Sequence, residues 1–158
     1  LYRIFGDKEG LACAILERRL DLHIHVLSDL NLSELTPEQA LRRVAIRMAQ
    51  LMAGTDSQVV YRIVIGEGQS FPALRDWFFD HVVASIRRTL EDYFEQQVAA
   101  GRLQLASPRA AAGQFYMSLF GDQVVRLAAG GPHLPDVDTL EAQTLAAVDL
   151  FLQGALPR

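Results

Sequence analysis

The chain has 158 residues, which is long enough for one compact domain with a proper hydrophobic core. Half of the residues are hydrophobic and 22% are charged, a composition typical of a globular protein and not of a disordered one. The net charge of −4 argues against a protein that binds nucleic acid along its whole length, and no apolar run is long enough to span a bilayer. The single cysteine, Cys13, excludes an internal disulfide and fits a reducing cytoplasm, where we expect the protein to act.

Basic charge is concentrated at the start of the chain. The first twenty residues carry a net charge of +1, whereas the remaining residues carry −5. Of the fifteen basic residues, the one lysine, Lys8, lies in this first segment. Any contact with DNA is therefore expected there, and the acidic body of the chain is expected to have another role.

Residues 1–11 have the local signals of a helix end, a tight turn and a new helix. Gly6 can end a helix because glycine adopts a positive φ at no steric cost. Asp7 is a favourable N-cap for the next helix, and Glu9 places negative charge in its first turn. The spacing predicts a helix, a turn of a few residues and a second helix.

Three side chains around this turn have the chemistry of phosphate contacts. They supply a phenol, a guanidinium and an ammonium group close to a helix N-terminus, where free backbone N–H groups already favour an anion. These residues are Tyr2, Arg3 and Lys8. The alternative is a purely structural role, in which Tyr2 packs in a core and Lys8 is a solvated cap.

The rest of the chain is predicted to be helical throughout. Prolines and glycines fall at the boundaries of segments whose apolar residues recur at helical spacing, and alternating strand patterns are scarce. Thr36 is a predicted N-cap with Pro37 in the first helical position, and Gly101 fits a left-handed C-cap. The predicted helices span approximately 7–28, 37–53, 57–69, 72–100 and 108–129, followed by a last helix from Asp136 or Asp138 to about Gly154.

The last two predicted helices are apolar on more than one side, so each needs two packing partners. One side can pack on the core of its own chain, and the other can pair with the same two helices of a second copy. We therefore predict a homodimer through a four-helix bundle; the alternative is a helix pair that is merely well buried. The residues expected to contribute are Tyr116, Leu119, Val124, Leu140, Val148, Phe151 and Leu152.

A binding pocket for a small apolar or amphipathic effector is expected between the middle helices. Methionine and aromatic side chains are large and adaptable enough to line it. The candidates are Met48, Met52, Tyr61, Ile65, Phe78, Phe79, Val82 and Phe115. The alternative is plain hydrophobic core, which is the commoner role for each of them. Arg62 and Glu67 are charges within an apolar segment that could orient a ligand or form a structural ion pair.

No catalytic or metal-binding constellation is evident. His23 and His25 are two residues apart and so lie on different faces of a helix, and no spacing of serine, histidine and aspartate suggests a triad. We therefore expect no enzyme activity, no metal and no cofactor. A third hypothesis is a small helical enzyme that uses Glu67 and His81.

The opening motif resembles the end of the recognition helix, the turn and the next helix of TetR-type transcriptional regulators. It comprises Leu1-Tyr2, an aromatic Phe5, the pair Lys8-Glu9 and Leu11. Further along, Val60 to Glu67, Phe71-Pro72 and Gly101 to Leu103 before Ser107-Pro108 are similar to the AcrR/AefR-like branch of that family. In this order, the motifs extend the resemblance over essentially the whole chain.

The resemblance implies an all-α fold with two parts. Residues 1–10 would be the incomplete end of a helix-turn-helix DNA-binding domain, since the two helices that should precede it are absent from this sequence. Residues 11–158 would be a helical ligand-sensing and dimerisation domain. The expected function is a homodimeric, ligand-responsive repressor that binds operator DNA through the full-length protein. The alternative is a stand-alone helical ligand-binding and dimerisation module without an operator.

Overall fold

The computed structural model describes residues 25–66, 68–131 and 134–157, and every regular element in these ranges is helical. The elements are η1 (Leu32–Glu34), α2 (Pro37–Ala53), α3 (Thr55–Gly66), α4 (Pro72–Phe78), η2 (Phe79–Val83), α5 (Ala84–Ala99), α6 (Pro108–Ala128) and α7 (Val137–Ala155). The all-α prediction is confirmed. The predicted first helix, the helix-turn-helix remnant and Tyr2, Arg3 and Lys8 lie outside the described residues.

Helix starts follow local capping chemistry. Thr36 caps α2 in a capping box, in which its hydroxyl accepts from the Gln39 amide at 3.3 Å and the Gln39 side chain accepts from the Thr36 amide at 3.2 Å. Ser107 caps α6 in the same manner, accepting from Ala110 N–H. Of the two candidates for the start of the last helix, Asp136 is the N-cap. These boundaries agree with the prediction because capping depends on nearest neighbours in sequence.

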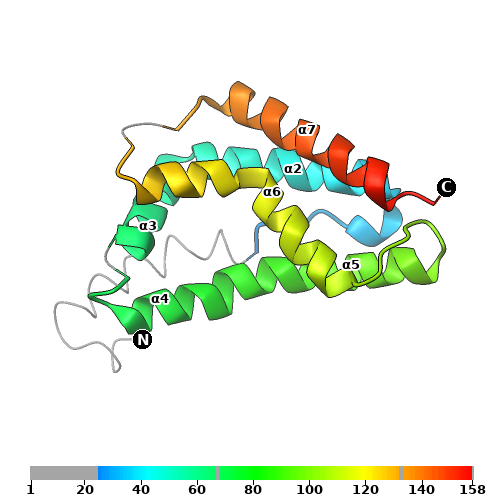
Figure 1. The fold of residues 1–158 in the computed structure, drawn as a ribbon, viewed down its shortest axis with the longest axis horizontal. Helices are drawn as coiled ribbons and strands as arrows, with labels where there is room; N and C mark the ends of the chain where they lie inside the picture. Colours follow the sequence, from blue (N-terminus) through cyan, green and yellow to red (C-terminus); the bar gives the residue numbers. More distant parts are fainter. Residues whose placement is uncertain (1–24, 67, 132–133, 158) are drawn as a thin grey trace.

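Two layers of helices pack against each other (Figure 1). In one, α7 lies along α2; in the other, the first part of α6 packs against α5. The second part of α6 runs beside α2 and α3, and α3 closes one end. The α2–α7 contact carries an ion pair of 2.6 Å between Arg42 and Asp149 and a hydrogen bond of 3.1 Å from Gln50 to Glu141. Within the described ranges no helix is long and apolar enough to cross a membrane.

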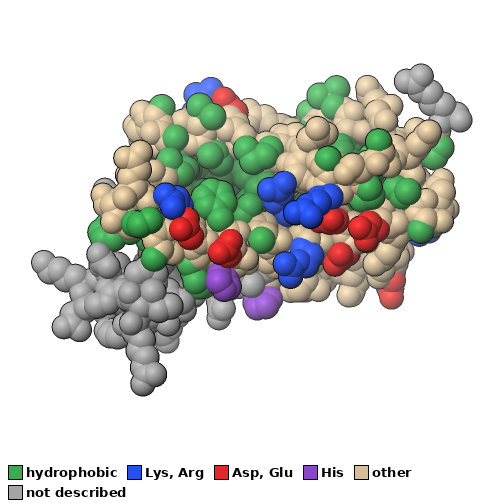
Figure 2. Space-filling model, turned by 60° about the horizontal axis from the view of Figure 1, so that its bottom comes forward, with side chains coloured by type: hydrophobic (Ala, Val, Ile, Leu, Met, Phe, Trp, Pro, Cys, Tyr) green, Lys and Arg blue, Asp and Glu red, His purple; other side chains and the backbone are tan. Residues whose placement is uncertain are grey.

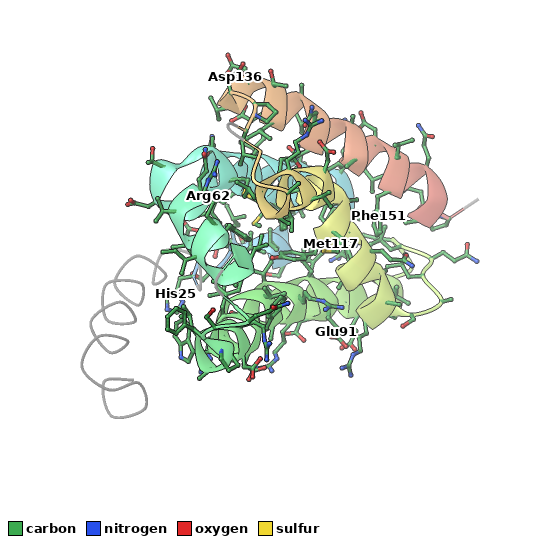
Figure 3. The ribbon with its side chains drawn as sticks, turned by 60° about the vertical axis from the view of Figure 1, so that its left-hand side comes forward. His25, Arg62, Glu91, Met117, Asp136 and Phe151 are labelled. Atoms are coloured by element: carbon green, nitrogen blue, oxygen red, sulfur yellow. The ribbon has the colours of Figure 1, made fainter. Side chains whose placement is uncertain are left out.

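An aromatic cluster fills the core where three helices meet. The rings of Phe94 on α5 and Phe151 on α7 stack with centroids 5.3 Å apart, and Phe115 on α6 lies 5.0 Å from Phe151. Phe94 and Phe115 are fully buried, whereas Phe151 lies at the edge of the core (Figure 3). The cluster fixes α6 relative to both layers.

The predicted helix over 72–100 is continuous but contains a π-helical turn, η2, at Phe79–Val83. A π turn fits one residue more than a regular turn, and such turns are frequent at functional sites. On the facing side, α6 bends at Phe120, whose φ of −152° and ψ of 18° are not helical (Figure 1). Neither the π turn nor the bend can be predicted from the hydrophobic pattern of the sequence. Residues of both line the same cavity.

Candidate ligand-binding pocket

A cavity of about 250 Å³ lies between α3, the α4–α5 helix and α6. It is lined almost entirely by apolar and aromatic side chains, as expected of a site for a small organic molecule. Its lining residues are Tyr61, Val64 and Ile65 from α3, Phe78, Phe79, Val83 and Arg87 from the α4–α5 helix, and Gly113, Tyr116, Met117, Phe120 and Val124 from α6. Figure 2 shows hydrophobic side chains gathered on this side of the molecule, with a group of basic and acidic side chains beside them.

The two helix irregularities shape this cavity. The π turn begins at Phe79, which is 52% exposed, while its neighbour Phe78 is buried, and both line the cavity. The bend in α6 comes at Phe120, between Tyr116 and Val124, so the lining residues of α6 come from both sides of the bend. A regular helix on either side would pack closer to its neighbour, since interiors are normally close-packed.

The walls of the cavity are edge-to-face aromatic pairs. Tyr61 and Phe78 lie with ring centroids 5.5 Å apart, and Tyr116 and Phe120 with centroids 4.6 Å apart. These geometries are the favourable ones for aromatic rings, and they hold the rings in place without a ligand. The site is therefore largely preformed.

Two tyrosine hydroxyls supply a polar end. Tyr61 and Tyr116 are both buried, and their phenol groups lie close enough for each to affect the pKa of the other. Burial raises the pKa of Tyr61, and burial together with the neighbouring Tyr61 raises the pKa of Tyr116 well above its usual value. Both groups are therefore protonated near neutral pH.

Among the described residues that line the cavity, Arg87 is the one with a charged side chain. Its positive charge lies close enough to Tyr116 to oppose the rise of that phenol's pKa. The guanidinium lies against α6 at Gly113: a Cβ added there would come within 3.2 Å of Arg87 Cζ and still closer to Nη2. Gly113 thus provides the space in which Arg87 lies.

Comparison with known proteins gives the family. Residues 39–154 match the C-terminal domain of the AefR-like transcriptional repressors. The chain belongs to the TetR family. The match covers most of the described helices, and the members of this family are transcriptional regulators and not enzymes.

Solved structures of TetR-family regulators have the same fold. A regulator from Mesorhizobium loti superposes with a TM-score of 0.80 at 20% identity, covering 99% of this chain and 79% of that one. A regulator from Agrobacterium tumefaciens gives 0.73 at 24% identity, covering 100% and 77%. The flavonoid-responsive regulator FrrA gives 0.70 at 26% identity, covering 99% and 79%. A search among curated proteins gave no significant match.

Half of the pocket residues predicted for this TetR-family domain line the cavity. Tyr61, Ile65, Phe78 and Phe79 do so. The other four, which are Met48, Met52, Val82 and Phe115, are buried in the core and do not line it. Phe115 points into the aromatic cluster with Phe94 and Phe151.

The other eight lining residues were not predicted to line a pocket. Tyr116 and Val124 were assigned to dimerisation instead, and the remaining six are Val64, Val83, Arg87, Gly113, Met117 and Phe120. A signal existed, because Phe79, Val83 and Arg87 recur every four residues, and a charge that continues an apolar stripe faces the same surface as that stripe. In the sequence alone, a charged residue on a long helix such as Arg87 is interpreted as solvent-exposed, and a glycine such as Gly113 is interpreted as a packing contact. Their joint role depends on two helices that meet only in the fold.

The residues predicted for dimerisation are mostly used within the chain. Tyr116, Leu119, Leu140, Val148 and Leu152 are buried in the monomer, and Val124 and Phe151 are half-buried. Tyr116 and Val124 also line the cavity. The most exposed apolar side chains of α6 and α7 are other residues, among them Met117, Val125 and Leu150.

Of the remaining polar candidates, Arg62 and His81 make contacts within the described part of the chain. Arg62 donates from Nη2 to the carbonyl oxygen of Gly131 at 3.0 Å, which ties α3 to the end of α6. His81 stacks on Trp77 with ring centroids 4.8 Å apart, and its Nδ1 lies 2.9 Å from the Trp77 carbonyl oxygen. Glu67 lies outside the described residues. In the described ranges no group of three or more metal-ligating side chains comes together.

Proposed function

We propose that this chain is the sensing and dimerising part of a ligand-responsive TetR-type repressor. Residues 1–10 would belong to the DNA-binding unit and residues 11–158 to the regulatory domain. The observation that carries the proposal is the position of the cavity, which lies between the α4–α5 helix and α6. A ligand in it would contact both helices at once.

The dimer would form through the outward faces of α6 and α7. These faces carry small or apolar exposed side chains at helical spacing, namely Ser118, Val125 and Ala128 on α6 and Ala142, Ala146, Leu150 and Gly154 on α7. Val125 and Leu150 are 65% and 71% exposed, and a Cβ at Gly154 would meet nothing within 4 Å. Small residues allow close approach of helices, and a self-complementary face favours a two-fold dimer.

The ligand would be a small apolar or amphipathic molecule. An apolar cavity of roughly 150 Å³ holds benzene, so the cavity of about 250 Å³ suits a ring compound larger than benzene. The relative FrrA is named for its response to flavonoids, which are flat phenolic ring compounds. Flavonoids are therefore suitable first probes for this chain.

Regulation would come from a difference in ligand affinity between two arrangements of the dimer. Because α6 lines the cavity and also presents the dimer face, a ligand that prefers one position of α6 would change how the two subunits meet. Reversing a 99:1 preference requires about 5.5 kcal/mol of differential binding. DNA contact would involve Tyr2, Arg3 and Lys8, by resemblance to the family.

The test is operator selection with the regulator that carries a complete helix-turn-helix, followed by titration of the selected DNA with and without the flavonoid naringenin. A repressor of this kind selects a palindrome, binds it with a steep salt dependence, and releases it when the ligand is added. If no sequence is selected while this chain still dimerises and binds ligand, the stand-alone module is correct. Tighter DNA binding with ligand would contradict release by the effector.

A further inference from the structure

The cavity has one charged corner, and the arrangement of charge there suggests what kind of ligand it accepts. Arg87 lines the apolar cavity and also a neighbouring polar surface depression formed with Arg88, Glu91 and Arg109. It therefore lies where the cavity opens to the surface. Glu91 and Met117 lie on the adjacent helices α5 and α6 (Figure 3).

The charge of Arg87 is not neutralised inside the cavity. The described lining residues include no carboxylate, and within the described ranges Arg87 forms no ion pair. Its neighbouring depression contains three arginines and a single glutamate, so positive charge is in excess there. An excess of one sign at the mouth of a low-dielectric cavity attracts a ligand group of the opposite sign.

The guanidinium lies against the backbone of α6. Gly113 leaves space for it, and any side chain at that position would displace it. The hydroxyls of Tyr61 and Tyr116, which also line the cavity, add further hydrogen-bonding groups next to the aromatic walls. The cavity thus combines a bidentate cationic donor at its mouth with an apolar interior.

We propose that the ligand is an amphipathic ring compound with an anionic end, a carboxylate or an acidic phenol, which binds Arg87 while its rings lie between Phe79 and Met117. This rests on the proposed function in taking the cavity as the effector site. It goes further by naming the charge of the effector and the residue that selects for it. A neutral apolar compound of the same shape would bind more weakly.

The experiment compares naphthalene-2-carboxylate with naphthalene-2-carboxamide, which has the same shape without the charge. Binding to the 158-residue chain is measured by calorimetric titration at neutral pH. We expect the carboxylate to bind roughly tenfold more tightly than the amide, the lower end of what a charged hydrogen bond provides. In Arg87→Gln this preference should disappear, and the affinity for the amide should remain within about twofold.

Two further variants make the result specific. Arg88→Gln removes the same charge from the adjacent residue, which does not line the apolar cavity, and should keep the preference. Gly113→Ala keeps Arg87 but displaces its guanidinium, and should reduce the preference as well. Thermal melts by circular dichroism show whether each variant is folded as the parent chain is.

Equal binding of the two compounds, absence of binding by both, or a preference that survives Arg87→Gln would overturn the inference. The outcome is separate from that of the regulator proposal. If naringenin releases the operator while the two naphthalene compounds bind equally, the regulator proposal stands and the inference fails. If the carboxylate preference depends on Arg87 but no ligand affects DNA binding, the inference stands and the regulator proposal fails.

Discussion

Phe115 is a core residue of this protein, and Phe79 is a cavity residue. Both are phenylalanines within helices, and sequence patterning predicts both as pocket residues. In the structure Phe115 has no exposed surface and packs between Phe94 and Phe151, whereas Phe79 is 52% exposed and lines the cavity. We therefore expect Phe115→Leu to lower mainly the free energy of unfolding, and Phe79→Leu to lower mainly the affinity for ligand.

The cost of Phe115→Leu has two parts. A hydrophobic swap of similar volume usually costs less than about 1.5 kcal/mol, and each of the two lost aromatic pairs adds roughly 0.5–1.5 kcal/mol. We expect a loss of about 2 kcal/mol in the free energy of unfolding. With a urea m-value of about 2 kcal/mol/M, the unfolding midpoint should fall by about 1 M.

The assay is urea denaturation followed by circular dichroism at one fixed protein concentration, because dimerisation makes the midpoint depend on concentration. Phe79→Leu is the matched control: its free energy of unfolding should stay within about 0.5 kcal/mol of the parent, while its affinity for naphthalene-2-carboxylate falls. If Phe115→Leu keeps the parent midpoint but loses ligand affinity, the assignment of Phe115 to the core is wrong.

Three further predictions concern other parts of the fold. Leu150→Glu places a charge on the exposed face of α7 and should shift sedimentation toward monomer, whereas an unchanged dimer at micromolar concentration would place the interface elsewhere. The side-chain oxygen of Gln97 is buried without a hydrogen-bond partner, so Gln97→Met should raise the free energy of unfolding by about 1 kcal/mol; a lower value in urea denaturation would mean that the amide is satisfied in solution. Burial raises the pKa of Tyr93 to about 12, above its unfolded value near 10. The stability from this group is complete below about pH 10 and is lost as pH rises toward 12, so Tyr93→Phe should flatten part of the decline in alkaline melts, and an unchanged slope would contradict the assignment.

Helix boundaries could be predicted because their causes are local. Thr36, Ser107 and Asp136 each bond to a backbone amide three residues ahead, so a short stretch of sequence contains the whole signal. The left-handed glycine at the end of α5 belongs to the same class, with a φ of 68° at Gly101. No knowledge of the tertiary structure was needed for these positions.

The cavity could be predicted only in part, because its shape depends on contacts between distant segments. The apolar stripe indicates Phe78 and Phe79 as pocket residues, but it does not show the π turn that begins at Phe79 or that Phe79 is exposed while Phe78 is buried. The pairing of Arg87 with Gly113 joins two helices, and neither residue alone indicates it. The apolar pattern of the last helix likewise does not show which of its sides the rest of the chain covers, so burial of Leu140, Val148 and Leu152 within the chain could not be predicted.

The π turn at Phe79–Val83 also bears on how this chain is aligned with its relatives. The extra residue in the π turn rotates the side chains that precede it by about 100° about the helix axis relative to a regular helix, because an α-helix has 3.6 residues per turn. A relative with a regular helix here would lack one residue between its equivalents of Phe78 and Ala84. An alignment without that gap would pair cavity residues of one protein with surface residues of the other. Specificity within this branch of the family should therefore be compared by superposed structures, in which a one-residue deletion changes the cavity and leaves the core of α5 in place.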